Sequence, residues 1–240
     1  MDATVDRIVG EIDDRLRAEG TIDRAEHEKT YLKSELTHYG TRVPAIRAAT
    51  KAAAKRHQIA AHDAVVAVAE VLWSAPVHER RMAAVELLDL KHDLLHPADA
   101  PLIERLLREA RTWALVDDLA LNVMGSLVAR YSELSAVLDR WAQDDDFWMR
   151  RSALLALLRP LREGAGDWER FATYADAMLD EKEFFIRKAI GWVLRETAKG
   201  RPQLVVDWLV PRAGRASGLT IREAIKPLSE AQRAAVEAAR

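Results

Sequence analysis

A repeat of about 35 residues runs through this chain of 240 residues and most constrains its fold. The stretches Val77–Leu88, Thr112–Val123 and Phe147–Leu158 align at that spacing, and Phe184–Arg195 starts 37 residues after the third. Apolar residues recur at helical spacing, and Ala, Leu, Arg and Glu dominate. Helical repeats of this length stack on their neighbours. We therefore predict an all-α fold, a HEAT-like helical-repeat solenoid (an α-α superhelix), as a single domain over residues 1–240.

Local signals mark some helix ends. Thr220 followed by Glu223 predicts a capping box at a helix start. The acidic run at residues 144–146 predicts a set of negative charges at a helix N-terminus. A stack of helices built this way curves, and its concave face forms an extended binding surface.

One position breaks the packing pattern of the repeats. Met82, Asp117, Ser152 and Ala189 occupy the same position in the four aligned stretches. Three of them are small or apolar, as a contact between packed helices requires, whereas the second stretch has a carboxylate. Trp113 precedes Asp117 by four residues, so the two share a helix face. An indole beside a carboxylate suits a cation, and we predict a functional site at this pair.

Basic residues form two further patterns. Arg47, Lys51 and Lys55 are spaced by four, which places them in one stripe on a helix. Such a stripe follows phosphates or is a solvated face. Three of the four stretches also share a basic pair, namely Arg80 with Arg81, Arg150 with Arg151, and Arg187 with Lys188. This ladder either tracks a nucleic-acid backbone or pairs with acids of neighbouring repeats.

Composition limits the function classes. A net charge of −2 argues against a uniformly basic nucleic-acid coat, although residues 182–240 hold 12 Lys and Arg against 6 Asp and Glu. That excess indicates a polyanion partner or ordinary surface asymmetry. The lack of cysteine excludes disulfides and a thiol nucleophile and fits a cytoplasmic protein. The 7 histidines show no metal-ligand motif, and we see no phosphate loop, signal peptide or membrane span, so we expect no metal, cofactor or membrane.

Four segments resemble one known family. KEFFIRKAIGWVLRETAK (Lys182–Lys199), TWALVDDL (Thr112–Leu119), WMRRSAL (Trp148–Leu154) and YLKSELTHYGTRVP (Tyr31–Pro44) resemble the AlkD-like DNA alkylation repair family, the HEAT-like alkylpurine DNA glycosylases. The resemblance covers essentially the whole chain in the right order, and Lys182–Lys199 is its most specific part. It implies an all-helical, cofactor-free protein with a basic concave face that wraps duplex DNA and releases cationic N3- and N7-alkylated purines.

The resemblance also implies roles for single residues. The family's catalytic aspartate falls on Asp117, the tryptophan one turn earlier on Trp113, and an arginine needed near the lesion on Arg151. A second functional tryptophan falls on Trp192, with Tyr31 beside it.

The family's expected DNA contacts also have counterparts in this sequence. Gly40, Pro44 and Arg47 match its Gly-x-x-x-Pro-x-x-Arg start of a DNA-facing helix. We expect further DNA contacts from Lys51, Lys55, Arg187 and Lys188. Thr112 departs from the family, which has a further aromatic residue there.

The expected chemistry needs little machinery. Alkylation at N3 or N7 gives the purine a formal positive charge, so it is already a good leaving group. One ionised carboxylate such as Asp117 suits the remaining task, which is to stabilise an oxocarbenium-like sugar. No lysine stands out beside Asp117, so we predict a monofunctional glycosylase without lyase activity. We also expect a monomer that is nucleoid-associated when bound to DNA. Two alternatives remain open: a DNA-binding member of the same fold without catalysis, and a protein-binding HEAT scaffold.

Overall fold

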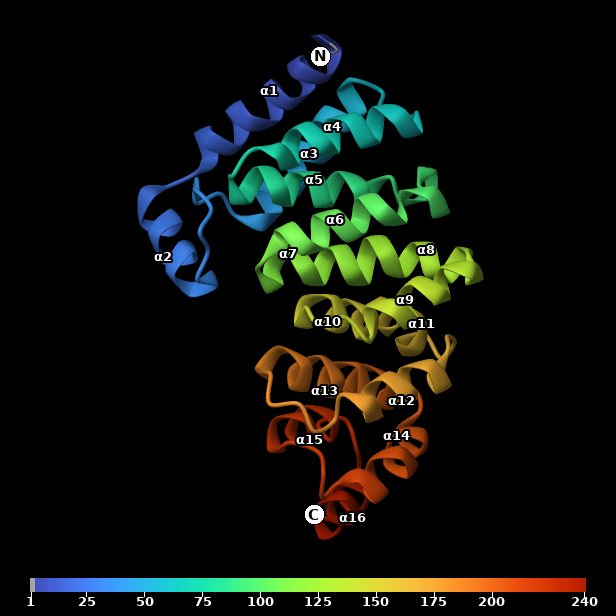
Figure 1. The fold of residues 1–240 in the computed structure, drawn as a ribbon. Helices are drawn as coiled ribbons and strands as arrows, with labels where there is room; N and C mark the ends of the chain where they lie inside the picture. The colour runs from blue at the N-terminus through green and yellow to red at the C-terminus, as the bar shows by residue number, and fades with distance from the viewer. Residues whose placement is uncertain (1–2) are drawn as a thin grey trace. The chain divides into compact units, whose positions relative to one another are not determined.

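The computed structural model of the protein describes residues 3–240 and is built from helices (Figure 1). Within that range, β-structure is limited to an isolated bridge between Thr37 and Val77. The predicted all-α fold is therefore confirmed. None of the described helices has the length and apolar character needed to cross a bilayer.

The chain divides into two compact units, Met1–Leu119 (unit 1) and Ala120–Arg240 (unit 2). The prediction of a single domain over residues 1–240 stays a prediction, as does the basic concave face.

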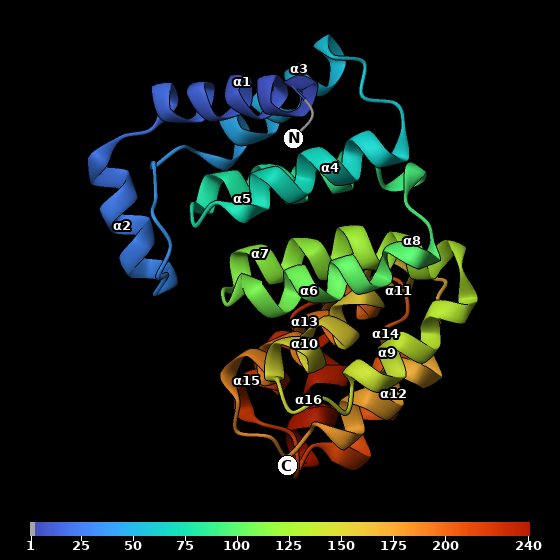
Figure 2. The same cartoon turned by 45° about the horizontal axis from the view of Figure 1, so that its top comes forward.

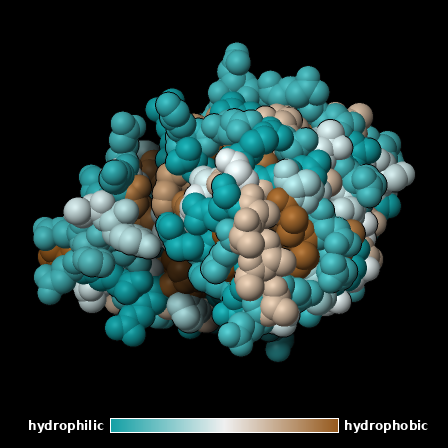
Figure 3. Space-filling view, turned by 90° about the horizontal axis from the view of Figure 1, so that it is seen from below, coloured by the Kyte–Doolittle hydropathy of each residue, from teal (hydrophilic) through white to brown (hydrophobic). Residues whose placement is uncertain are grey.

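The view in Figure 3 shows a surface that is mostly hydrophilic, with apolar side chains gathered in small areas.

Unit 1 is a stack of helices with one helix set to the side. Its elements are α1 (Ala3–Glu19), α2 (Ile22–Leu32), α3 (Val43–Arg56), α4 (His62–Ser74), α5 (His78–Leu90), η1 (His92–Leu94), η2 (Pro97–Asp99), α6 (Ala100–Ala110) and α7 (Trp113–Asp118). Leu16, Leu72 and Leu87 have no exposed surface and form part of the core among α1, α4 and α5. Helix α2 buries none of its side chains and lies beside the stack in both views (Figure 1 and Figure 2).

A buried carboxylate holds the connection between α2 and α3. Glu79, the second residue of α5, accepts hydrogen bonds from the backbone N–H groups of Tyr39 (2.9 Å), Gly40 (2.7 Å) and Thr41 (3.2 Å). Gly40 has φ +79°, and a Cβ there would lie 2.2 Å from the carbonyl oxygen of Thr21, so only glycine fits. These contacts fix the point at which α3 begins.

Unit 2 continues the helical pattern. A π-helical segment, η3 (Leu119–Met124), spans the division between the units. It is followed by α8 (Gly125–Arg130), η4 (Ser132–Leu134), α9 (Ser135–Trp141), α10 (Phe147–Ala156), α11 (Leu158–Arg162), α12 (Trp168–Ala177), α13 (Phe184–Ala198), α14 (Pro202–Leu209), η5 (Val210–Arg212), α15 (Gly218–Ala224) and α16 (Glu230–Ala238). Trp141 and Phe171 are fully buried in the core of unit 2.

Close packing of α13 against α15 depends on a glycine. A Cβ on Gly191 would lie 2.7 Å from Cβ of Glu223 and 2.9 Å from the carbonyl oxygen of Thr220. Any larger residue would push the two helices apart. The glycine therefore helps to fix the position of α13, which carries Trp192 next in sequence.

The local predictions at helix starts have different outcomes. Asp146 caps α10 and accepts a hydrogen bond from the N–H of Trp148 (2.9 Å), as the acidic run predicted. The capping box at Thr220 is wrong: the cap of α15 is Ser217, whose Oγ accepts from the N–H of Thr220 (3.1 Å). Helix α15 begins earlier than predicted because an N-cap serine satisfies the same free backbone amides.

Candidate functional site

Helix α7 places Trp113 and Asp117 on its less buried face. Both side chains are half-buried, whereas Leu115 and Val116 on the opposite face have no exposed surface. At the position equivalent to Asp117, the other aligned stretches have buried side chains: Met82, Ser152 and Ala189 are 3%, 0% and 0% exposed. The second stretch thus carries a partly accessible carboxylate where the others have packed residues.

Tyr31 joins this pair from α2. Its ring meets the indole of Trp113 edge-on, with ring centroids 5.9 Å apart and an interplanar angle of 90°. Tyr31 is 65% exposed, so this aromatic pair has a face open to solvent. The expected pairing of Tyr31 with Trp192 would connect the two units and stays a prediction.

The basic stripe of α3 lies on one exposed helix face, as predicted. Arg47, Lys51 and Lys55 are all exposed. Arg47, however, already has acidic partners: its Nε donates to Oε1 of Glu86 (2.7 Å), and Nη2 lies 4.0 Å from Oδ2 of Asp118. Lys51 and Lys55 therefore remain the better candidates for contacts to phosphate.

The second acid of α7 has a distinct environment. Burial raises the pKa of Asp118, the Arg47 guanidinium opposes that rise, and the charge of Asp117 adds to it. Burial likewise raises the pKa of Glu86, against the hydrogen bond from Arg47. Arg47, Glu86 and Asp118 thus form an ion-pair group, and Asp118 is the residue that follows Asp117 in the sequence.

In unit 2, Arg151 is built into an aromatic cluster. The residue is 3% exposed, donates a hydrogen bond from Nη1 to the carbonyl oxygen of Phe185, and has its guanidinium 5.6 Å from the ring centroid of Phe185. The ring of Trp148 lies 4.7 Å from that of Phe185. Trp192 is half-buried on α13. The structure thus places Arg151 and Trp192 in unit 2, and Asp117 and Trp113 in unit 1.

The repeated basic pairs are used mainly for internal contacts. Arg150 donates from Nε (3.0 Å) and Nη2 (2.9 Å) to the carboxylate of Glu181. Arg187 donates from Nε to the carbonyl oxygen of Glu181 (2.7 Å). These contacts favour the ion-pair alternative for Arg150. Lys188 is exposed, with Nζ 6.0 Å from the ring centroid of Phe184, and stays a candidate for a DNA contact.

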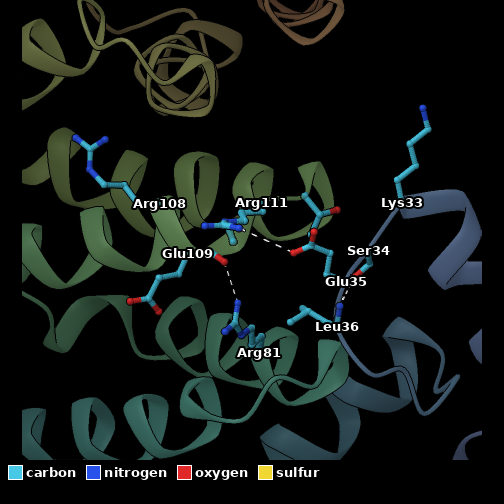
Figure 4. Close-up of a pocket in the computed structure, with 10 residues that line it drawn as sticks. Lys33, Ser34, Glu35, Leu36, Arg81, Arg108, Glu109 and Arg111 are labelled. Carbon is cyan, nitrogen blue, oxygen red and sulfur yellow. Dashed lines mark hydrogen bonds and ion pairs between the residues drawn. The ribbon is translucent and has the colours of Figure 1, made fainter.

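A basic pocket of about 460 Å³ was not predicted from the sequence (Figure 4). The residues directly before Trp113 in the sequence form part of its lining. Its lining residues are Lys33, Ser34, Glu35, Leu36, Arg81, Arg108, Glu109, Ala110, Arg111 and Thr112. Of its two acids, Glu35 lies 3.9 Å from Nη1 of Arg111. Glu109 already accepts a hydrogen bond from Nε1 of Trp73 (2.7 Å). The four cations of the lining therefore outweigh its acids.

Unpaired buried groups indicate that this pocket favours an anion. Arg81 Nε and Thr112 Oγ1 are buried without a hydrogen-bond partner. Burial lowers the pKa of Arg81, the charge of Glu109 opposes that effect, and the charge of Arg111 adds to it. Lys33 and Arg111 both have φ +49°, the left-handed conformation of a residue that ends a helix.

The helical segment after Asp118 is a second feature without a sequence signal. Leu119–Met124 forms a π-helix, in which each turn holds an extra residue. Such segments are frequent at functional sites because they change the direction of the side chains that follow. No glycine or proline in this segment marked it in advance.

Fold and site together define an all-α protein with a partly accessible tryptophan–carboxylate pair. The residues just before this pair in the sequence line a basic pocket. The profile of the DNA alkylation repair enzyme family matches residues 12–228, and the chain belongs to this family. A solved structure described as a predicted DNA alkylation repair enzyme from Enterococcus faecalis has the same fold, with a TM-score of 0.78 and 23% identity, over 88% of this chain and 98% of that one. No curated protein gives a match. The family resemblance inferred from the sequence is confirmed.

Proposed function

We propose that this protein is a monofunctional DNA glycosylase that hydrolyses the N-glycosidic bond of cationic N3- and N7-alkylated purines in duplex DNA. Its membership of a DNA alkylation repair family supports DNA as the substrate. One observation carries the proposal: Asp117 is a partly accessible carboxylate one turn after Trp113, at a position where the other aligned stretches bury Met82, Ser152 or Ala189.

In the proposed reaction, the bond between the sugar C1′ and the purine nitrogen breaks, and both electrons leave with the base. The alkylated purine thereby becomes neutral, and positive charge develops on the sugar. The carboxylate of Asp117 stabilises this charge electrostatically. A water oxygen then bonds to C1′ and releases one proton to solvent, which leaves an abasic sugar beside the free base.

The aromatic residues have a matching role in the proposal. The π faces of Trp113 and Tyr31 attract a cationic base or sugar, because an aromatic ring carries negative charge on its faces. Trp192 is assigned a second aromatic contact, and Arg151 the cation near the lesion. Both assignments rest on the segments Lys182–Lys199 and Trp148–Leu154, which resemble the family.

Phosphate contacts are assigned to the cations that lack strong internal partners. Lys51 and Lys55 on α3 and Lys188 on α13 are exposed. Arg111 and Lys33 line the basic pocket and are assigned further phosphate contacts. Phosphate contacts of this kind position a protein on DNA without reading its sequence.

We expect no lyase activity. Lyase chemistry needs an amine that attacks the sugar, and no lysine stands out beside Asp117 in the sequence. We therefore expect the abasic strand to stay intact until alkali is added.

The test is the release of 7-methylguanine and 3-methyladenine from methylated duplex DNA by the wild-type protein. Free bases together with an intact abasic strand are the expected result. Duplex binding without any release would contradict the proposal and favour the non-catalytic DNA-binding alternative. No duplex binding even at low salt would favour the protein-binding scaffold.

A further inference from the structure

Two histidines and one aspartate of unit 1 converge where α4 begins and α6 begins. Nε2 of His62 lies 2.9 Å from Oδ1 and 3.0 Å from Oδ2 of Asp99. Nδ1 of His96 lies 3.4 Å from Oδ2 of the same carboxylate. The two imidazoles are stacked, with ring centroids 4.3 Å apart. Each of the three side chains thus brings one nitrogen or oxygen into the same small region, where these atoms lie within 4.8 Å of one another.

The separations match those of a metal site. Ligand atoms that surround zinc tetrahedrally at about 2.0–2.1 Å lie about 3.3 Å from one another. The 2.9 to 3.4 Å between the two imidazole nitrogens and Asp99 are close to this value, and binding by both imidazoles requires the stacked rings to turn until both nitrogens face one ion. Mixed imidazole and carboxylate donors suit zinc and neighbouring transition metals, whereas calcium and magnesium prefer oxygen alone.

The surroundings of these residues already hold them in place. Nδ1 of His62 is hydrogen-bonded to Oδ1 of Asp63 (2.9 Å). Nε2 of His62 faces Asp99 at hydrogen-bond distance, so a metal would take the place of the proton between them, with the Nδ1 proton still donated to Asp63; carboxylates often orient metal-binding histidines in this way. Asp99 is oriented by the backbone N–H of His96 (2.9 Å).

Access to the point of convergence is uneven. The side chain of Asp99 is 8% exposed, whereas those of His62 and His96 are 28% and 46% exposed. A buried anionic ligand with two solvent-facing imidazoles gives an ion a path of entry.

We propose that His62, His96 and Asp99 bind one divalent transition-metal cation, zinc being the best match, with water completing its coordination. This site is independent of the proposed glycosylase function. Helix α6, 11 residues long, separates Asp99 at its start from Arg111 after its end, a distance of about 16 Å along the helix. The metal therefore acts as a cross-link between the first residue of α4 and the turn before α6.

A bound proton is the competing occupant. Hydrogen bonds to Asp63 and Asp99 raise the pKa of His62, so protonated His62 can hold the two carboxylates together without a metal. The two occupants differ at His96, which a proton on His62 does not require. A metal needs both imidazoles.

The test is a calorimetric titration of untagged, chelator-treated protein with ZnCl₂, together with thermal unfolding. We expect one zinc ion per chain, micromolar or tighter affinity, and a rise in melting temperature. His62→Gln and His96→Gln should each weaken binding at least about tenfold and remove the rise. His92→Gln, which removes a nearby imidazole outside the cluster, should leave both unchanged.

NMR of the histidine side chains provides a test without substitutions. In the wild-type protein, zinc should shift Nε2 of His62 and Nδ1 of His96 and leave the rings of His27 and His92 unchanged. Failure to bind zinc, zinc shifts confined to other histidines, or affinity unchanged in His62→Gln/His96→Gln would each overturn the proposal.

Discussion

Asp117 and Asp118 are adjacent carboxylates with different surroundings. Their side chains leave the helix about 100° apart, so they cannot face the same point. Asp118 lies 4.0 Å from Arg47 and its pKa is raised by burial. Asp117 instead shares a face with Trp113. Asp118 is thus the natural control for experiments on Asp117.

His78 should make the stability of the protein depend on pH. It is 5% exposed, stacks on His38, and burial lowers its pKa to about 3, with the charge of His38 adding to the effect. The unfolded chain binds a proton at His78 near pH 6.5, which the folded chain does not, so stability is lost as pH falls below that value. Between pH 6.5 and pH 5 the loss should be roughly 2 kcal/mol.

Urea unfolding at several pH values measures this loss. His78→Gln should lose less stability over the same pH range, whereas His27→Gln, which removes an exposed histidine of α2, should behave as wild type. Equal pH dependence in wild type and His78→Gln would show that His78 is not held neutral.

For single residues, sequence patterns predicted positions on a helix better than they predicted hydrogen-bond and ion-pair partners. The repeat alignment correctly singled out Asp117 as the unusual member of a buried position. The stripe of Arg47, Lys51 and Lys55 was also correct, but the pairing of Arg47 with Glu86 was not foreseen. That partner is 39 residues away, and such pairs depend on how helices pack rather than on spacing along one helix.

Among the elements, the connection before α3 should depend on Glu79. Its buried carboxylate accepts hydrogen bonds from three consecutive N–H groups, starting at Tyr39. Glu79→Gln removes the charge and places an amide NH₂ near other donors, so it should lower the free energy of unfolding by about 2 kcal/mol or more. Glu70→Gln breaks only an exposed pair with Arg105 and should cost less than about 1 kcal/mol. Similar losses for both variants in urea unfolding would contradict this role of Glu79.

Replacing Arg111 in the basic pocket should have opposite effects on stability and on DNA binding. Arg111→Gly relieves a positive φ and should raise the free energy of unfolding by up to about 1 kcal/mol, while weakening duplex binding. Gln58→Gly relieves a φ of +51° outside the pocket and should stabilise the protein without affecting binding. Unfolding curves and fluorescence anisotropy measure both quantities. Unchanged DNA affinity in Arg111→Gly would remove the pocket from the proposed interface.

Elements were predictable where a periodic pattern existed and not where local geometry decides. Helical periodicity gave the all-α class, and the acidic run gave the cap at Asp146. The cap at Ser217 was missed because Thr220 offers the same chemistry three residues later. The π-helix was missed because its sequence carries no local signal, and the pocket at Arg111 was missed because it combines segments that lie far apart in the sequence.

For the whole molecule, charge is more evenly distributed than the C-terminal sequence indicates. Unit 1 holds 17 Lys and Arg against 21 Asp and Glu, and unit 2 holds 19 against 17. The basic excess of residues 182–240 is partly paired inside unit 2, as in the contacts of Arg212 and Arg215 with Asp176 (2.9 Å each). Ion pairs inside unit 2 thus account for part of that excess, and the proposed DNA binding relies on a few exposed cations.

This distribution predicts a moderate salt dependence of duplex binding. Five exposed cations are candidates for phosphate contacts, namely Lys33, Lys51, Lys55, Arg111 and Lys188. Each contact contributes about 0.9 to the slope of log K against log salt, so the slope should lie between about −3 and −5. Anisotropy titrations at several salt concentrations measure it. A slope near zero would argue against phosphate contacts, and a much steeper one would require cations beyond these five.

The central claim is that Asp117 stabilises charge on the sugar, and the most direct measurement is single-turnover excision of 7-methylguanine by Asp117→Asn and Asp118→Asn. The account predicts that Asp117→Asn loses about a hundredfold or more in rate while its affinity for duplex DNA is retained. Asp118→Asn should excise at nearly the wild-type rate. Excision by Asp117→Asn at the wild-type rate, or an equal loss in both variants, would contradict the account.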